Sequence, residues 1–578
     1  MDRIIDTAKK IRVKDFILKR LGCKTKLNFA TIHFCVFRFN SILTILILFS
    51  YSFVFSQEES NSNPNGTFNA FLTTQTGFFI RDSNIGAIHT PQYDHQLYGG
   101  QSWLDAMYSN WGFEFGVRLD YFQNSNLINP LGSFNKQGIG RWFIRKEDTK
   151  FGFEAGYIYD QIGTGIIYRA YEARTQGLDN ALQGVKLNLN INQNWHLKAF
   201  AGKQKKQFDV YESLIKGIAL DGFVKASDTS HFSMAPGLGI VNRTIDDASL
   251  DNALATIATY PKANQFLPRY NTYACTLYDQ INAGNFTLYL ESAFKSNDVF
   301  NDPNALRQDD QGNLYQAPTL IHKSGHVLYG SINYVKSSFG LTLEAKRTQY
   351  FSFRTRPQEE ANNGLISFIP PMSRQQSYNL LSFYQPATQE IGESAFKGEL
   401  QFNLGENEET ILHISHINDL NQNKLYREYY AEGSSRKKNR TILASVQYRE
   451  YNQQVYEGKP NAPLVKTFVL NLDGTFKLNE VRALRVNLET MTTKQDQGNW
   501  ISILAEYSIA PKWIFTLSDM YNGTKKKNYN TAMVTYSHLS NRVSLGWVRQ
   551  RAGIVCTGGI CRYEPAFNGI KFNLEARF

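Results

Sequence analysis

Few residue groupings in this chain have the types and spacing of a catalytic or metal site. His413 and His416 lie three positions apart, which on a β-strand places them on opposite faces, and His322 and His326 lie in or beside a predicted loop. Neither pair has cysteine or carboxylate neighbours at ligand spacing. The run Gly163-Thr164-Gly165 lacks the lysine and the further glycine of phosphate-binding loops, and no local motif joins a serine, a histidine and an acid. We therefore expect no enzyme, no cofactor and no metal site.

A cluster of mixed charge is the strongest candidate for a functional site. It contains five ionisable residues of both signs around the bends that Gly163 and Gly165 permit. One precedes these glycines and four follow them: Asp160, Arg169, Glu172, Arg174 and Asp179. Opposed charges can line a pore constriction and set its selectivity for ions and solutes. The same residues can instead form a salt-bridged network that anchors an inward-folded segment and has no part in the passage of solutes. Both interpretations stay open on the sequence.

Two cysteines, Cys556 and Cys561, enclose a turn that contains Gly558 and Gly559. In an oxidising compartment this spacing favours a disulfide over two free thiols. A zinc site would need further cysteine or histidine nearby, and none is present in the sequence around it. We predict a small loop closed by a disulfide.

The elements that carry these residues alternate polar and apolar side chains with a period of two. The last eight residues place Phe572, Leu574, Ala576 and Phe578 on one face and four polar residues on the other, as a β-strand does. Similar alternation recurs along the chain, and its polar positions are often charged, which in a barrel would face the lumen: Glu154, Lys198, Glu291, Glu344, Lys346, Lys397, Glu399, Arg449, Arg485, Glu489 and Glu506.

The amino-terminal region has the pattern of an export signal. Basic residues precede one apolar run, 42–55, which is long enough for a signal-peptide core and short for a spanning helix, and small residues precede Gln57. Cleavage there is favoured over an uncleaved anchor. We predict a cleaved presequence with signal peptide over 1–56, a short polar leader over 57–66 and a single outer-membrane β-barrel over 67–578.

The net charge gives little support for binding nucleic acid. The formal net charge is +11 and the pI is about 9.1, but the predicted presequence holds ten Lys or Arg and three Asp or Glu. The remaining chain has 52 basic and 48 acidic residues, a balance of +4. We therefore expect no nucleic-acid partner.

Two all-β architectures are compatible with the alternation. A soluble exported β protein would show it too. The long unbroken strand series, the aromatic residues at strand ends and the terminal aromatic favour a transmembrane antiparallel β-barrel, with about 20 to 26 strands and a best estimate of about 24. No run of eighteen uncharged apolar residues follows the presequence, which argues against a helical membrane bundle.

Long connections are predicted between some of the strands. They cover 244–267, 296–324, 352–373 and 417–439. In the first, Leu250, Ala253, Leu254 and Ile257 recur at helical spacing, which predicts one short helix in a loop. That helix could fold into the lumen as a constriction, or remain a surface loop.

Several blocks of the chain resemble one known family. They are 159–174, 177–181, 345–354, 369–372, 385–389 and 558–563, and they occur in the family's order. The chain thereby resembles an uncharacterised family of Bacteroidota exported proteins, known only as a domain of unknown function. The resemblance implies an outer-membrane location and a porin-like β-barrel, and it supplies no substrate, reaction or binding residue.

The expected location is the outer membrane of a Gram-negative cell. Charged residues facing the lumen predict a channel or porin-like conduit for small solutes, and long loops leave open a non-transport barrel that acts as a scaffold or partner in an envelope assembly. Expected partners are outer-membrane lipid, lipopolysaccharide near the basic runs 436–440 and 525–527, and the barrel-assembly machinery, with Phe578 as insertion signal. An envelope protein partner would be of unknown identity.

The predicted disulfide has a direct chemical test. In the native protein we expect Cys556 and Cys561 to resist alkylation until a reductant is added, because a disulfide has no thiolate to react. Mass spectrometry of peptides labelled before and after reduction measures this. Labelling of both residues in the native, unreduced protein would contradict the disulfide.

Overall fold

The computed structural model describes residues 66–227 and 231–578. The predicted presequence, 1–56, lies outside the described residues, as does all of the predicted leader except Gly66. Contacts group residues 65–577 into one unit, and the first strand of that unit begins at Thr67.

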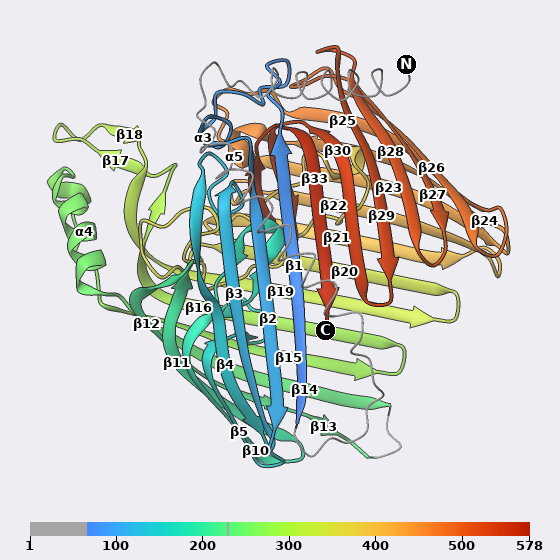
Figure 1. Ribbon diagram of the computed structural model, residues 1–578. Coiled ribbons are helices and arrows are strands. Elements are labelled where there is room, and N and C mark those ends of the chain that lie inside the picture. Colours follow the sequence, from blue (N-terminus) through green and yellow to red (C-terminus); the bar gives the residue numbers. More distant parts are fainter. Residues whose placement is uncertain (1–65, 228–230) are drawn as a thin grey trace, which may run out of the picture. The chain divides into compact units, whose positions relative to one another are not determined.

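A single antiparallel sheet closes on itself to form a barrel of 24 wall strands. The first strand, β1 (Thr67–Phe79), pairs with β2 (Tyr98–Asn110) on one side and with the last strand, β33 (Phe567–Arg577), on the other. Figure 1 shows this seam, where the blue β1 lies beside the red β33. The all-β barrel prediction is confirmed, and the strand number equals the best estimate from sequence.

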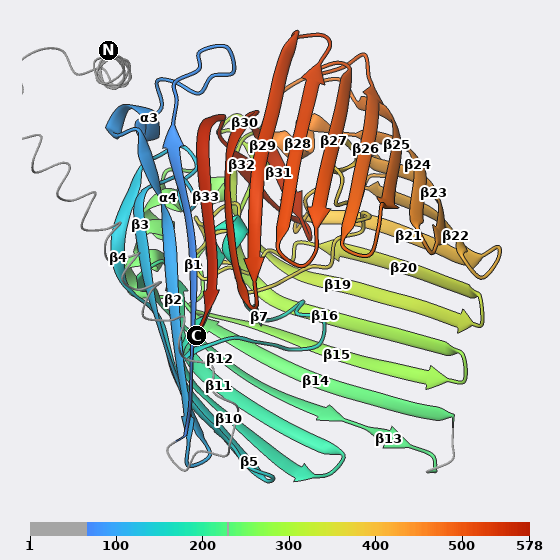
Figure 2. The same ribbon diagram turned by 45° about the vertical axis from the view of Figure 1, so that its right-hand side comes forward.

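The wall follows chain order around the barrel, and Figure 2 shows most of the series. After β1 and β2 come β3 (Phe113–Ser125), β4 (Phe134–Glu147), β5 (Phe151–Ile158), β10 (Leu182–Asn192), β11 (Trp195–Lys206), β12 (Asp209–Gly222), β14 (Phe232–Thr244), β15 (Asn271–Ala283), β16 (Phe286–Asp302) and β19 (Thr319–Lys336). The other half, which ends at β33, contains β20 (Phe339–Gln349), β21 (Gly392–Asn403), β22 (Glu408–Asn418), β23 (Lys424–Lys437), β24 (Arg440–Tyr451), β25 (Val465–Lys477), β26 (Arg482–Thr492), β27 (Trp500–Ile509), β28 (Trp513–Asn522), β29 (Lys527–His538) and β30 (Asn541–Gln550).

The two faces of the wall have opposite polarity, and the apolar face is the exposed one. In β25, Phe468, Leu470 and Leu472 are 43%, 50% and 51% exposed, whereas Asn471 and Asp473 between and beyond them are buried. A soluble sheet would bury its apolar stripe and expose its polar one. The reversed arrangement suits a wall with lipid outside and polar groups inside, so it favours the membrane barrel over the soluble β protein.

The connections differ systematically between the two rims of the barrel. Because neighbouring strands are antiparallel, successive connections alternate between rims. One rim, here the short-turn rim, carries turns such as 111–112, 193–194 and 337–338, and there the wall both begins and ends. The opposite rim, the long-connection rim, carries the longest segments: 80–97, 159–181, 245–270, 303–318, 350–391 and 551–566.

The predicted loop helix is present as α4 (Asp247–Ala258). Asp246 caps it by accepting a hydrogen bond from the Ser249 backbone N–H at 2.9 Å. Ala253 and Ile257 pack with Val299 of β16, with Leu320 near the start of β19 and with Tyr260. Figure 1 shows α4 near β17 (Leu306–Gln308) and β18 (Leu314–Gln316). The helix lies at the long-connection rim, which agrees with the prediction of a surface loop and not with a constriction in the lumen.

The remaining elements are short and lie in connections. They are α3 (Pro91–His95), α5 (Gln453–Glu457), the 3-10 turns Arg174–Gln176, Lys262–Asn264 and Leu380–Ser382, and the strands β6 (Asp160–Gln161), β7 (Arg169–Ala170), β8 (Glu172–Ala173), β9 (Leu178–Asp179), β13 (Val224–Lys225), β31 (Gly553–Thr557) and β32 (Ile560–Glu564). Within the described ranges, no helix is both long and apolar enough to cross a membrane.

One predicted long connection is wrong. Residues 417–439 contain the wall strand β23, paired along its length with β22 and β24. Its outward positions include Ala431, Gly433 and Ser435, so the apolar stripe that marks the other strands is weak here. Pairing with two neighbours forms the strand where side-chain alternation alone does not indicate it.

The polarity of the wall can be tested at Leu470. Replacing it by arginine (Leu470→Arg) should cost about 2–4 kcal/mol of folding free energy in a bilayer, because a charge near the midplane of the outer face meets lipid. Leu478→Arg is the matched control, since Leu478 lies in the turn after β25 and should cost about 0–1 kcal/mol there. Denaturant titrations in lipid vesicles measure both, and equal costs would contradict a lipid-facing Leu470.

Candidate functional site: the lumen plug

Three long connections enter the barrel and contact one another, and together they are called the lumen plug here. They are the 159–181 segment, the 350–391 segment and the 551–566 hairpin. Backbone bonds join the first two: the Arg169 N–H donates to the Ile366 carbonyl at 2.9 Å, and the Phe368 N–H donates to the Gly165 carbonyl at 2.9 Å. Main-chain hydrogen bonds therefore join plug segments that lie far apart in sequence.

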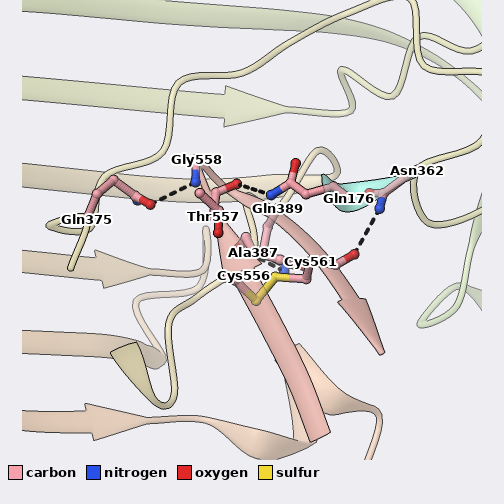
Figure 3. Close-up of a disulfide and its surroundings, with 9 residues drawn as sticks. All are labelled: Gln176, Asn362, Gln375, Ala387, Gln389, Cys556, Thr557, Gly558 and Cys561. Carbon is pink, nitrogen blue, oxygen red and sulfur yellow. Dashed lines mark hydrogen bonds between the residues drawn. A yellow bond between two sulfur atoms is a disulfide. The ribbon is translucent and has the colours of Figure 1, made fainter. Parts of the chain in front are cut away.

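The 551–566 hairpin carries the predicted disulfide and contacts both other segments (Figure 3). Cys556 and Cys561 are bonded, with their Cα atoms 4.0 Å apart across the β31–β32 pair. Gln176 donates its side-chain amide to the Thr557 carbonyl at 3.1 Å, and Asn362 donates to the Cys561 carbonyl at 2.9 Å. The cross-linked tip thus lies where the other two segments meet.

The predicted charge cluster separates into parts, of which one is a compact ionic network. Arg118 of β3 contacts Asp120 at 2.6 Å, Glu172 at 2.6 Å and Asp179 at 3.0 Å, and its side chain is 2% exposed. Lys205 of β11 adds a second cation, 2.5 Å from Asp179. Burial alone would raise the pKa of Asp179, but the charges of Lys205 and Arg118 lower it overall.

The other members of the predicted cluster lie in different surroundings. Arg174 joins the network by bridging Glu172 and Asp105 of β2, each at 3.0 Å. Asp160 instead lies 3.1 Å from Lys198 of β11. Arg169 stacks on the rings of Tyr171 and Phe368, 4.3 and 4.0 Å from their centroids. The structure therefore brings Glu172, Arg174 and Asp179 together and places Asp160 and Arg169 elsewhere.

A glycine turn fixes the start of the 159–181 segment to the wall strand β16. Glu291 of β16 accepts bonds from the Thr164 backbone N–H at 3.0 Å and the Thr164 hydroxyl at 2.6 Å. The preceding Gly163 has a φ of +56°, and a Cβ atom there would lie 2.7 Å from a Glu291 carboxylate oxygen. Glycine is needed at this position for both reasons.

The middle of the 350–391 segment rests on wall carboxylates. Glu489 of β26 accepts three backbone N–H groups at the start of the 3-10 turn, from Asn379 at 3.1 Å, Leu380 at 2.8 Å and Leu381 at 3.2 Å. A single carboxylate therefore satisfies the N–H groups that the first turn of any helix leaves free.

A second anchor of the same segment is the buried pair of Arg449 and Glu428. Arg449 of β24 lies 3.0 Å from Glu428 of β23 and donates to the carbonyls of Leu381 and Phe383. Glu428 also accepts the Arg374 backbone N–H at 3.1 Å. The ion pair thus holds the plug backbone through both of its partners.

The start of the 350–391 segment is held by lumen-facing cations. Lys295 of β16 donates to the Ser352 carbonyl at 2.7 Å, and Arg243 of β14 donates to the Arg354 carbonyl at 2.9 Å. Both cations contact Asp298 of β16, at 3.3 and 2.7 Å. Charged wall residues here bond directly to main-chain groups of the plug.

The sequence predicts that several of these anchoring side chains are charged and point into the lumen, but it does not predict which groups they contact. Glu291, Arg449 and Glu489 were expected to face water in the lumen, and they bond instead to plug backbone. Their alternation on the strands reveals their direction. Nothing in the local sequence identifies partners that lie 66 to 127 positions away.

The histidines do not assemble a metal site. His413 faces the lumen between Glu399 and Glu428, at 3.3 and 3.6 Å, while His416 points outward and contacts Tyr429. In the part of the chain that the structure describes, no group of three or more His, Cys, Asp or Glu side chains is placed to hold a metal ion.

The fold and the plug define a class: a closed, outer-membrane-type β-barrel whose lumen holds its own inward-folded connections. The chain belongs to a family of unknown function, DUF6029, whose model matches residues 39–578. No curated protein matches the chain in sequence.

Solved structures with related barrels are only distantly similar. The siderophore receptor PirA from Pseudomonas aeruginosa has 10% identity and a TM-score of 0.39, over 90% of this chain and 81% of that one. The P pilus usher (PapC) translocation pore has 7% identity and a TM-score of 0.41, over 88% and 99%. The P. aeruginosa outer membrane protein opdK has 10% identity and a TM-score of 0.31, over 78% and 99%. At this level of similarity we draw no conclusion about function.

Removal of Arg118 tests the ionic network. Arg118→Ala leaves three carboxylates without their shared cation, so we expect a loss of about 3–5 kcal/mol in the free energy of unfolding. Arg145→Ala is the control, because its pair with Glu114 at 2.8 Å is solvent-exposed and should be worth about 1 kcal/mol or less. Urea titration in detergent measures both. Equal, small losses would contradict the anchoring role of Arg118.

Proposed function

We propose that this chain is an outer-membrane barrel protein that acts as a porin-like conduit for small solutes, narrowed by the lumen plug. The observation that carries this proposal is the polarity of the wall, with apolar side chains outside and ionised ones inside. A polar lumen with inward-folded loops is the usual construction of a solute-selective channel. In this proposal the plug sets which solutes pass.

We further propose that the long-connection rim faces the cell exterior, because outer-membrane barrels carry short turns on the periplasmic side. Lys525 and Lys526 lie in a connection at this rim, between β28 and β29. Their charges would contact lipopolysaccharide phosphates. The other basic run, 436–440, spans the β23–β24 turn at the short-turn rim and would face the periplasm.

A second candidate function is a non-transport barrel that serves as a scaffold in an envelope assembly. The observation that favours it is the number of lumen charges already bonded to the plug, including Arg118, Glu489 and Arg449. Charges used to hold a plug are not free to attract solutes. Co-purification of a stable partner with the barrel from mildly solubilised membranes would support this candidate.

Conductance separates the two functions. In planar bilayers we expect small, discrete conductance steps from the full chain. A variant in which residues 553–564 are replaced by a short Gly-Ser linker should show larger steps, because the cross-linked tip of the plug is removed. If neither protein conducts and neither allows solute uptake into vesicles, the conduit proposal is wrong and the scaffold is favoured.

A further inference from the structure

A cavity of about 320 Å³ lies beside the base of the 551–566 hairpin. It is bounded by residues 382–385 of the plug, by the connections after β24 and β26, and by the hairpin itself. Aromatic side chains line it, among them Phe383, Tyr384, Tyr451 and Tyr563. The volume is at the lower end of the range for small-molecule sites.

Among the residues that the structure describes, no carboxylate oxygen lies within ion-pair distance of Arg551, one of the two cations in this cavity. Its guanidinium group stacks on Phe383, 3.7 Å from the ring centroid, and lies 5.9 Å from the Trp500 ring. Within the described ranges, its side chain makes one hydrogen bond, a long contact from Nη1 to the Ala552 carbonyl at 3.4 Å. Stacking covers the face of the guanidinium and leaves N–H groups at its edge for an acceptor.

Most other arginines in or beside the plug are ion-paired, whereas Arg169 stacks on the rings of Tyr171 and Phe368. Arg118, Arg174, Arg354, Arg374, Arg449 and Arg562 each have a carboxylate oxygen within 3.1 Å. Desolvation lowers the pKa of Arg551, and the opposing effects, among them the charges of Asp496 and Glu457, are too small to offset it. Arg551 therefore differs from the ion-paired arginines that hold much of the plug together.

The acidic groups of the cavity already have partners. Lys459 contacts Glu457 at 2.7 Å and Asp496 at 3.1 Å, and the Tyr384 hydroxyl donates to Asp496 at 2.9 Å. Burial alone would raise the pKa of Asp496, but the bonds from Tyr384 and Lys459 lower it overall. These carboxylates are thus compensated without Arg551.

We propose that this cavity binds a small organic anion, whose carboxylate accepts hydrogen bonds from the free edge of Arg551 and whose apolar part packs on the aromatic lining. Arginine presents paired donors that match the two oxygens of a carboxylate. The inference deepens the proposed conduit function by naming a solute class, and it rests on that proposal only for the role of binding in transport.

Binding is measured on its own, by calorimetry with the purified full chain in detergent. The probes are benzoate, and benzamide as its uncharged analogue. We expect the full chain to bind benzoate and to bind benzamide about tenfold more weakly or not at all, because charge-assisted bonds are the stronger ones. Equal affinity for the two probes, or no binding of benzoate at millimolar concentration, would overturn the proposal.

Arg551→Gln should weaken benzoate binding by about tenfold or more. Arg549→Gln is the matched control, since Arg549 lies two positions away and already pairs with Asp82 at 2.7 Å. Heat-sensitive gel migration checks that both variants are folded barrels. Unchanged benzoate affinity in a folded Arg551→Gln protein contradicts the site. The binding measurement does not depend on conductance. If a barrel that does not conduct still binds benzoate, the conduit function is wrong and the anion site is still supported.

Discussion

The structure depends on the mutual satisfaction of wall charges and plug backbone. The 159–181 and 350–391 segments of the plug contain little regular secondary structure, so many of their N–H and C=O groups need partners from elsewhere. The inward face of the wall supplies ionised side chains that are costly to bury alone. Glu489 is an example of this mutual satisfaction. Its carboxylate accepts hydrogen bonds from three N–H groups of the plug, and these bonds supply the donors that its charge requires.

Closure of the wall makes this mutual satisfaction possible. A barrel joined between β1 and β33 has no free sheet edge, so the wall needs no contribution from the plug to its own hydrogen bonding. Strand register then places each inward side chain at a fixed height in the lumen. Glu291 and Arg118 can therefore hold the 159–181 segment at two separate points, Thr164 and Glu172.

The local pattern of the sequence predicts the wall well and the plug poorly. In segments such as 468–472, the alternation predicts both the strand and the direction of each side chain. It can do so because the polarity of each residue there depends only on whether it faces lipid or lumen. It fails at β23, where Ala431 and Gly433 occupy outward positions and the stripe weakens. The strand is formed there by its neighbours.

The plug resists prediction for a different reason. Asp160, Glu172 and Asp179 look equivalent in the sequence, yet the first pairs with Lys198 and the other two share Arg118. The cation that each carboxylate contacts depends on the three-dimensional distances between wall strands, which the local sequence does not contain. The disulfide is the exception, because Cys556 and Cys561 are neighbours in sequence and their pairing needs only a local turn.

Hydrogen exchange of the barrel in lipid nanodiscs tests most directly whether the plug is a fixed part of the lumen. We expect the amides of Thr164, Leu380 and Leu381, which donate to Glu291 and Glu489, to exchange as slowly as amides of paired wall strands. Exchange of these amides as fast as that of the exposed turn 478–481 would contradict a fixed plug, because the plug would then be a mobile set of loops.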